Sequence, residues 1–486
     1  MIRLPVQHTQ GTRLMKELAA PPQPPGKARV LSRRGRASRI AGLAMLLPFA
    51  LVSTAQDAPP APQPTLPTVV TTPAPKTPVA AGQVAYLPPP RDATPVAPAF
   101  DVARFEAMAQ AMVADGRVPG LAMAIVKDGK VLSARGYGTT DVDTGEGVNP
   151  HTVFRLASLS KAFAGTVTGL LVSEGALRWD SKVSEFMPEF QLSQPGAAQQ
   201  LTVAEVLSHR VGLTHNAYDG FIESGEDYRT LVHKLANAPM VCAPGDCYAY
   251  QNVAFSLIGD VVFAATGSFF SETVARRIFK PLGMDDASYG LEGITASPSW
   301  ARPHVRGRGG WASLSAPQPT YYRVAPAAGV NASISDMAQW LIAQTGHRPD
   351  VLPLPLLATL HAPVVDTPSE TRSSSWRRAR LDDAGYGIGW RVYDYAGHRV
   401  VYHGGAVQGY RGAIALVPGS DLGVVLLWNS TSNVPTGLMP TILDGALGLR
   451  GDWLDLDEDD VELLYASRKE AREFGSDAST SRAKPR

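Results

Sequence analysis

Four features are scarce or missing in this sequence, and each absence excludes a class of function. Only two cysteines occur among 486 residues, and without a neighbouring histidine they supply too few ligands for a metal site. A formal net charge of +1 with no basic stripe gives no support for a nucleic-acid partner. No Gly-x-Ser-x-Gly motif is present, which argues against an α/β-hydrolase nucleophile elbow. The apolar run 40–52 has 13 residues, whereas a membrane span needs about 20. We therefore expect no metal, cofactor or nucleic acid.

The two ends of the chain have the composition of non-globular segments. Four arginines within 33–39 precede the apolar run, and Ser53-Thr54-Ala55 follows it as a small-x-small cleavage pattern, which predicts a signal peptide with a long n-region over 1–55. Residues 56–99 hold 13 of the 40 prolines and form a predicted linker, and 451–486 form a predicted charged, disordered tail. We expect a periplasmic or secreted protein with no stable membrane span after signal cleavage; an uncleaved anchor is the alternative.

Between these ends, strand-like segments flank a helical middle. Apolar residues at helical spacing begin at Val102, and the segments 121–137 and 411–428 each predict a β-hairpin. The intervening stretch 154–345 is mainly helical in pattern. This order predicts an α/β (α+β) fold over residues 100–450, in which both ends of the domain build one antiparallel sheet, helices flank it and a helical lobe is inserted.

Three short motifs follow one another in the chain: Ser158-Leu159-Ser160-Lys161, Tyr250-Gln251-Asn252 and His403-Gly404-Gly405. A lysine three residues after a serine lies one helical turn away on the same face, so Lys161 is placed to touch Ser158. The motif alone is weak evidence, because Ser481 and Lys484 repeat it in the tail. The first copy is followed by an apolar stripe, which predicts that Ser158 lies at the N-terminus of an amphipathic helix: Phe163, Val167, Leu170 and Leu171.

These residue types match the requirements of serine acyl transfer. A serine hydroxyl is a poor nucleophile at neutral pH and needs a base within hydrogen-bond reach. Lys161 can be that base only when neutral, and burial would lower its pKa, whereas Tyr250 can take the proton as a phenolate if cations stabilise its charge. The sequence leaves both assignments open, and we treat the two groups as a coupled pair.

Further motifs occur around these three in a fixed order. They are Phe154-Arg155-Leu156-Ala157, Leu207-Ser208-His209 with Gly212-Leu213, Pro244-Gly245, Tyr386-Gly387-Ile388-Gly389-Trp390 and Gly409-Tyr410. With them the chain resembles the serine β-lactamase-related family, which contains class C β-lactamases, D-alanyl-D-alanine carboxypeptidases, D-aminopeptidases and esterases. The resemblance covers roughly residues 100–448.

The resemblance implies roles for individual residues. Asn252 would fix the lysine and bond the substrate amide, and His403 stands where many β-lactamases carry a lysine. Because histidine is mostly neutral near pH 7, that exchange weakens recognition of a substrate carboxylate. The implied site comprises the catalytic residues Ser158, Lys161 and Tyr250, the substrate-binding residues Asn252, His403, Gly404 and Gly405, and an oxyanion hole made by the N–H groups of Ser158 and Ala406.

The expected function is that of an exported serine hydrolase that forms an acyl-enzyme on Ser158. Its substrates would be D-amino-acid peptides or short acyl esters, and the partner would be a small molecule or peptide, including one derived from peptidoglycan. A class C-like β-lactamase and a non-catalytic penicillin-recognising binding module are the alternatives. Fold and nucleophile are shared among these activities, so the pocket decides between them.

Smaller expectations concern residues outside the motifs. Cys242 and Cys247 bracket a Pro-Gly turn, and in an exported protein they are expected to form a disulfide rather than remain two free thiols. His209 and His215 are expected to be core or helix-end histidines, because no metal-binding spacing accompanies them. Arg411 is expected to point to solvent, and the alternative is that it restores a cation for a substrate carboxylate.

Overall fold

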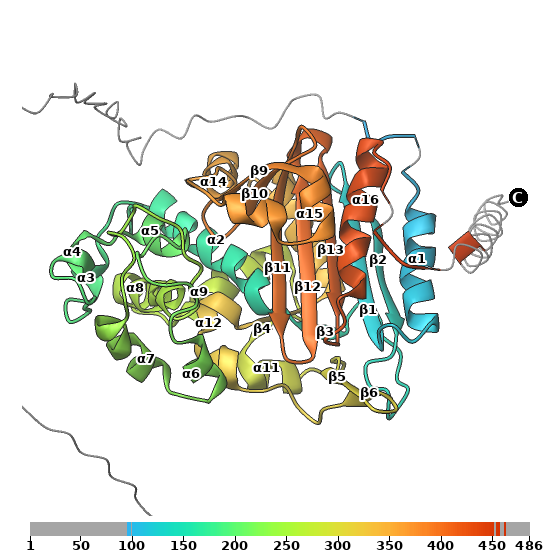
Figure 1. Cartoon of the computed structure of the whole chain (residues 1–486), viewed down its shortest axis with the longest axis horizontal. Helices are drawn as coiled ribbons and strands as arrows, with labels where there is room; N and C mark the ends of the chain where they lie inside the picture. The colour runs from blue at the N-terminus through green and yellow to red at the C-terminus, as the bar shows by residue number, and fades with distance from the viewer. Residues whose placement is uncertain (1–94, 99, 452, 457–460, 463–486) are drawn as a thin grey trace, which may run out of the picture. The chain divides into compact units, whose positions relative to one another are not determined.

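The computed structural model describes residues 95–98, 100–451, 453–456 and 461–462, all of them in one compact unit, Thr77–Arg486 (Figure 1). The predicted signal peptide lies outside the described residues, and so do most of the predicted linker and most of the predicted tail.

An eight-stranded antiparallel sheet is built from both ends of the domain, as predicted. Its two hairpins meet where β1 pairs with β13, in a register that places Leu121 opposite Trp428. The turn of the first hairpin contains Asp128 and Gly129, both with positive φ, as a tight two-residue turn requires. The strands in spatial order are β2 (Lys130–Gly138), β1 (Gly120–Lys127), β13 (Leu422–Trp428), β12 (Tyr410–Val417), β11 (His398–Val407), β10 (Arg391–Tyr395), β9 (Leu381–Tyr386) and β8 (Val365–Asp366).

Helices cover both faces of this sheet, so its central strands are buried on both sides. Every residue of β13 is buried, which explains its continuous apolar sequence. One face is covered by α1 (Val102–Ala114), α15 (Ser375–Arg380) and α16 (Leu438–Leu447), and the buried side chains of α1 include Phe105 and Met108. On the other face pack α2 (Ser160–Ser173) and α13 (Ile334–Ile342).

A helical lobe fills the middle of the chain and lies beside the sheet, with α2 between the two (Figure 1). Two small sheets accompany it, β3 (Val153–Arg155) with β7 (Val330–Ser333) and β4 (Ser288–Tyr289), and β5 (His304–Gly307) with β6 (Gly310–Ser313). The remaining helices are α3 (Val183–Phe186), α4 (Ala197–Gln200), α5 (Val203–Leu207), α6 (Asp219–Glu223), α7 (Tyr228–Lys234), α8 (Leu257–Thr266), α9 (Phe270–Val274), α10 (Lys280–Leu282), α11 (Gly290–Thr295), α12 (Ala325–Ala328) and α14 (Leu354–Leu360).

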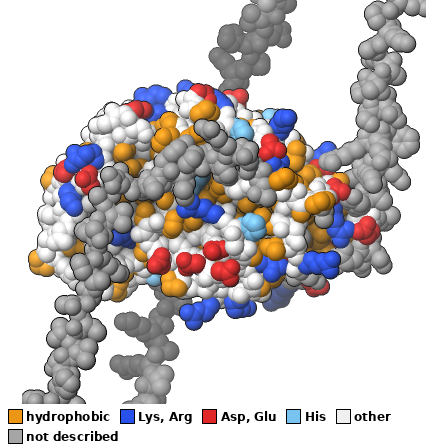
Figure 2. Space-filling view, turned by 90° about the horizontal axis from the view of Figure 1, so that it is seen from above, with side chains coloured by type: hydrophobic (Ala, Val, Ile, Leu, Met, Phe, Trp, Pro, Cys, Tyr) orange, Lys and Arg blue, Asp and Glu red, His pale blue; other side chains and the backbone are white. Residues whose placement is uncertain are grey.

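Among the described residues, no single helix has the length and apolarity of a membrane span, although the bent pair Ala254–Thr266 and Phe270–Leu282 meets both criteria when taken together. Charged side chains of both signs occur across the face shown in Figure 2. The described residues of the predicted tail contact the domain, since Trp453 donates to Asp444 and Val461 is buried.

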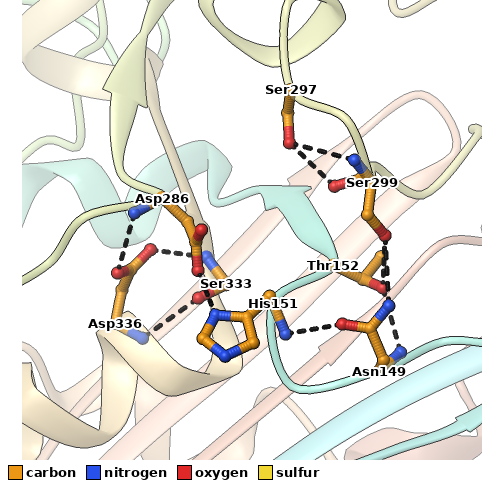
Figure 3. A network of polar contacts seen from close by, with 8 residues as sticks. All are labelled: Asn149, His151, Thr152, Asp286, Ser297, Ser299, Ser333 and Asp336. Atoms are coloured by element: carbon orange, nitrogen blue, oxygen red, sulfur yellow. Dashed lines mark hydrogen bonds and ion pairs between the residues drawn. The ribbon is translucent and has the colours of Figure 1, made fainter.

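A polar network fixes the chain just before β3 (Figure 3). Asp336 and Ser333 form the capping box of α13, and Asp336 also accepts a hydrogen bond from the backbone of Asp286. The carboxylate of Asp286 lies 2.8 Å from Nδ1 of His151, whose own backbone N–H donates to the side chain of Asn149. Because β3 leads directly to Ser158, this network helps to hold the serine in place.

Candidate active site

Ser158 lies on a short 3₁₀ turn, Ala157–Leu159, between β3 and α2. Ala157 has a φ of 49°, a left-handed conformation that is strained for alanine. Ser160 holds this turn, because its hydroxyl donates to the carbonyl of Ala157 at 2.6 Å and accepts from the N–H of Val330 at 3.0 Å. The predicted place of Ser158 at the start of a helix is therefore confirmed.

The helix that follows, α2, is buried on most of its surface and not only along the predicted apolar stripe. Of the 14 residues in α2, 11 are buried, whereas Leu170, which belongs to the predicted stripe, is only half-buried. The prediction of an amphipathic helix was wrong in this respect, because α2 runs between the sheet and the lobe and is covered by both.

Lys161 is fully buried and has three oxygen neighbours. Its Nζ lies 3.2 Å from Oγ of Ser158, 2.7 Å from Oδ1 of Asn252 and 3.1 Å from the carbonyl oxygen of Ala327. Burial lowers the pKa of Lys161 well below its ordinary value, and the nearby Arg391 lowers it further against the opposing effect of Asp219. A neutral lysine would donate its two N–H groups to Asn252 and Ala327 and leave its lone pair for the hydroxyl of Ser158.

Tyr250 approaches the same hydroxyl from the lobe. Its OH lies 2.9 Å from Oγ of Ser158, and Nζ of Lys161 lies 4.7 Å from the centroid of its ring. Burial raises the pKa of Tyr250, although its hydrogen bond to Ser158 and the cation of Arg391 oppose that shift. The phenol is therefore protonated at neutral pH, and of the two bases left open by the sequence the electrostatics favour Lys161.

Asn252 links this group to a carboxylate that sequence reasoning missed. Its side-chain N–H donates to Oδ2 of Asp219 at 2.7 Å, which turns the amide oxygen toward Lys161. Asp219 begins α6 and lines the same cavity as Ser158. Desolvation raises the pKa of Asp219, and the hydrogen bond from Asn252 opposes that shift. No motif marked this aspartate, because α6 is far from the serine in the chain.

His403, a predicted substrate-binding residue, lies on β11 beside Tyr386. Its side chain is buried, lies 3.2 Å from the hydroxyl of Tyr386, and does not line the cavity that contains Ser158. Burial lowers its pKa well below the ordinary value, and Arg391 adds to the effect. The predicted contact of His403 with the substrate stays a prediction; in the structure its ring centroid lies 6.5 Å from that of Tyr250.

The two glycines after His403 bring β11 against the serine turn. A Cβ atom on Gly405 would lie 2.5 Å from the carbonyl oxygen of Leu156 and 3.3 Å from N of Ser158, so only glycine fits here without movement. A Cβ on Gly404 would meet only the hydroxyl end of Tyr402, at 3.3 Å. The backbone of β11 therefore lies beside Ser158. The predicted oxyanion donors, the N–H groups of Ser158 and Ala406, would come from these two adjacent segments.

The end of β11 is also an open strand edge. β10 pairs with β11 only as far as Tyr402, so residues 404–407 are paired with β12 alone. These residues line a cavity of about 380 Å³ together with Ser158, Tyr250 and Asn252. An unpaired edge in a cavity can accept an extended peptide as an additional strand.

Arg411 lines this cavity, which makes the expectation of a solvent-directed side chain wrong. It lies opposite Ala406 on β12, is half-buried, and its Nε donates to the carbonyl of Thr431 at 3.1 Å. Among the lining residues it is the one cation and Asp219 the one anion. The cavity therefore offers one charge of each sign.

The remaining predicted residues lie close to the lobe side of the site. The Sγ atoms of Cys242 and Cys247 are 2.05 Å apart, at bonding distance, in the loop that leads to Tyr250. His209 is fully buried, as predicted, and its ring centroid lies 4.3 Å from that of Tyr250. The same prediction was wrong for His215, which is exposed in the loop between α5 and α6, with its ring centroid 6.2 Å from that of Tyr250. Within the described ranges, no group of three or more His, Cys, Asp or Glu side chains could hold a metal ion.

Comparison with known proteins agrees with this geometry. Residues 105–446 match the family model described as Beta-lactamase. A D-aminopeptidase of Gluconobacter oxydans is 30% identical over 357 residues, which are 71% of this chain and 62% of that protein. The unguisins hydrolase ungD' of Aspergillus campestris is 28% identical over 379 residues, 73% of this chain and 68% of that protein. The chain belongs to the beta-lactamase family.

Solved structures show the same fold. The octameric penicillin-binding protein homologue from Pyrococcus abyssi aligns with a TM-score of 0.64 at 25% identity, over 72% of this chain and 78% of that one. The D-amino acid amidase from Ochrobactrum anthropi SV3 aligns with a TM-score of 0.58 at 20% identity, over 71% and 97%. With a family of hydrolases and this constellation of side chains, the protein is a serine hydrolase.

Proposed function

We propose that this protein is an exported serine hydrolase that forms an acyl-enzyme on Ser158 and cleaves amide or ester bonds in D-amino-acid peptides or short acyl esters. The observation that supports acyl transfer best is the position of Oγ of Ser158, within 3.2 Å of Nζ of Lys161 and 2.9 Å of the hydroxyl of Tyr250. A nucleophile with both a proton acceptor and a proton donor in contact meets the geometric requirement of general acid–base catalysis.

In the proposed reaction, neutral Lys161 accepts the proton of Ser158 as Oγ bonds to the substrate carbonyl carbon. The negative charge that develops on the carbonyl oxygen is stabilised by the N–H groups of Ser158 and Ala406. Tyr250 donates its proton to the leaving nitrogen or oxygen as the old bond breaks, and Lys161 returns a proton to the tyrosine. Water then cleaves the acyl-enzyme by the reverse sequence of proton transfers.

The substrate class rests on the open edge of β11 and on the relatives. An extended peptide paired with residues 404–407 would lie with its carbonyl beside Ser158, as a strand added to the sheet. The names of the relatives, a D-aminopeptidase among them, favour D-amino-acid amides and peptides. Export rests on the predicted signal peptide over 1–55 alone.

An intact-mass time course tests this proposal. The full mature chain and Ser158→Ala are each mixed with D-alanine p-nitroanilide, p-nitrophenyl acetate and benzylpenicillin, and both adduct mass and product are followed. We expect release of nitroaniline or nitrophenol by the unchanged protein alone. Turnover retained in Ser158→Ala would refute the assignment of the nucleophile.

The same experiment separates the alternatives. Rapid consumption of benzylpenicillin without a lasting adduct would indicate a class C-like β-lactamase. A lasting Ser158 adduct with no turnover of any substrate would indicate a penicillin-recognising binding module. Release of the signal peptide is checked separately by N-terminal sequencing of the exported protein.

A further inference from the structure

His209 holds the backbone on both sides of Tyr250. Its carbonyl oxygen accepts from the N–H of Ala249 at 2.9 Å, and Nδ1 of its ring accepts from the N–H of Gln251 at 3.1 Å. The same ring lies against the face of the tyrosine ring, with centroids 4.3 Å apart. His209 has a φ of 58°, a conformation that costs a non-glycine residue free energy and persists where surrounding contacts impose it.

The other ring nitrogen of His209 begins a chain of hydrogen bonds that ends on β11. Nε2 of His209 lies 3.2 Å from the hydroxyl of Tyr386, which lies 3.2 Å from Nε2 of His403. Nδ1 of His403 lies 2.8 Å from the carbonyl oxygen of Gly404. Tyr386 therefore joins the loop of the catalytic tyrosine to the strand that borders the cavity.

The two ends of this chain fix the direction of every hydrogen bond in it. Because Nδ1 of His209 accepts from a backbone N–H, its proton is on Nε2 and is donated to Tyr386. Because the oxygen of Gly404 can only accept, Nδ1 of His403 carries a proton, and its Nε2 accepts the hydroxyl of Tyr386. Both histidines are thus neutral, in opposite tautomers. Burial also lowers the pKa of each well below the ordinary value.

We propose that His209, Tyr386 and His403 are positioning residues that hold Tyr250 in a fixed place relative to the substrate-binding edge of β11. None of the three lines the cavity, so they act on the reaction through Tyr250 and Gly404 rather than by contact with substrate. This inference rests on the proposed function, in which Tyr250 transfers a proton to the substrate. That transfer depends on the distance between Tyr250 and the bound substrate.

Single and double variants test this chain of hydrogen bonds. Tyr386→Phe keeps the ring but removes both hydrogen bonds, and His209→Asn tolerates the positive φ and keeps an acceptor for Gln251 while losing the bond to Tyr386. The rate constant for acylation of Ser158 by D-alanine p-nitroanilide is measured by release of nitroaniline, because the leaving nitrogen of this substrate needs the proton of Tyr250. We expect each single variant to be slower by about tenfold, because either substitution breaks the connection between Tyr250 and β11. The double variant should be no slower than either single one, because each single substitution already interrupts the chain of hydrogen bonds.

A matched control separates positioning from stability. Tyr395→Phe removes an equally buried hydroxyl, which donates to Asp444 far from the cavity, and should leave the acylation rate unchanged at a comparable loss of Tm. The proposal would be overturned if Tyr386→Phe were acylated at the wild-type rate. It would also be overturned if the rate loss of the double variant were the product of the two single losses.

A second readout does not depend on activity. Nitrogen-15 NMR of the histidine rings should show His209 protonated at Nε2 and His403 at Nδ1, with both signals displaced in Tyr386→Phe. The opposite tautomers, or imidazolium forms near neutral pH, would refute the proposed chain of hydrogen bonds even if Ser158 proves active. If the expected tautomers are observed but no Ser158-dependent acylation is found, the result would instead refute the proposed function. The proposed effect on Tyr250 would then fall with it.

Discussion

Adding one methyl group to Gly405 should reduce activity far more than adding one to the adjacent Gly404. In Gly405→Ala the new Cβ would lie 2.5 Å from the carbonyl oxygen of Leu156 and 2.8 Å from Cδ1 of Leu159. Non-bonded atoms prefer about 3.5 Å, so β11 and the serine turn must separate by ~0.5–1 Å. That movement widens the space between the two N–H donors of the oxyanion hole. A displacement of this size costs about 100-fold in rate, close to the ~3 kcal/mol lost with one donor.

The neighbouring substitution is the control. In Gly404→Ala the Cβ would meet only the hydroxyl end of the Tyr402 side chain, at 3.3 Å, and that side chain can adjust. Neither glycine has a positive φ, so alanine causes no backbone strain at either position. The assay is kcat/KM for a p-nitrophenyl ester, with Tm measured for both variants. Equal activity in the two alanine variants would refute the close approach of β11 to Ser158.

Three further predictions concern charge and covalent structure. In the proposed mechanism neutral Lys161 is the base, and burial lowers its pKa, so kcat/KM should rise with pH to a plateau below pH ~10, the ordinary range of lysine. An ascending limb at that ordinary pKa would contradict the proposed assignment. Asp219→Asn removes a carboxylate that raises this pKa, so the ascending limb should move toward lower pH, and a shift toward higher pH in the pH–rate profile would contradict it. Replacing Cys242 and Cys247 by serine should cost no more than about 2 kcal/mol in denaturant unfolding, because the closed loop is short. Recovery of two free thiols from the purified protein by mass would show that the bond is not formed.

The sequence predicted the sheet because its signals are local. Alternation of apolar residues, a two-residue Asp-Gly turn and runs of β-branched residues act over a few positions, and each hairpin appeared where these signals occur. The pairing of Ser158 with Lys161 is equally local, since one helical turn joins them. Recognition of Tyr250 and Asn252 needed the order of several motifs together.

The parts that sequence reasoning missed depend on contacts between distant segments. Asp219 reaches the site through Asn252, and Arg391 reaches it from β10, and neither belongs to a motif. The direction of Arg411 was also mistaken, since a strand residue points to one face or the other according to pairing that the sequence leaves open.

By itself, therefore, the sequence determined the elements, the contact between Ser158 and Lys161, and the family, because these depend on short-range periodicity and on motifs in a fixed order. Only the tertiary structure decided which base the electrostatics favour, which histidines are buried and which charges face the cavity. The physical reason is that a pKa and a side-chain environment depend on desolvation and on neighbours brought together by folding, and these are properties of the packed chain.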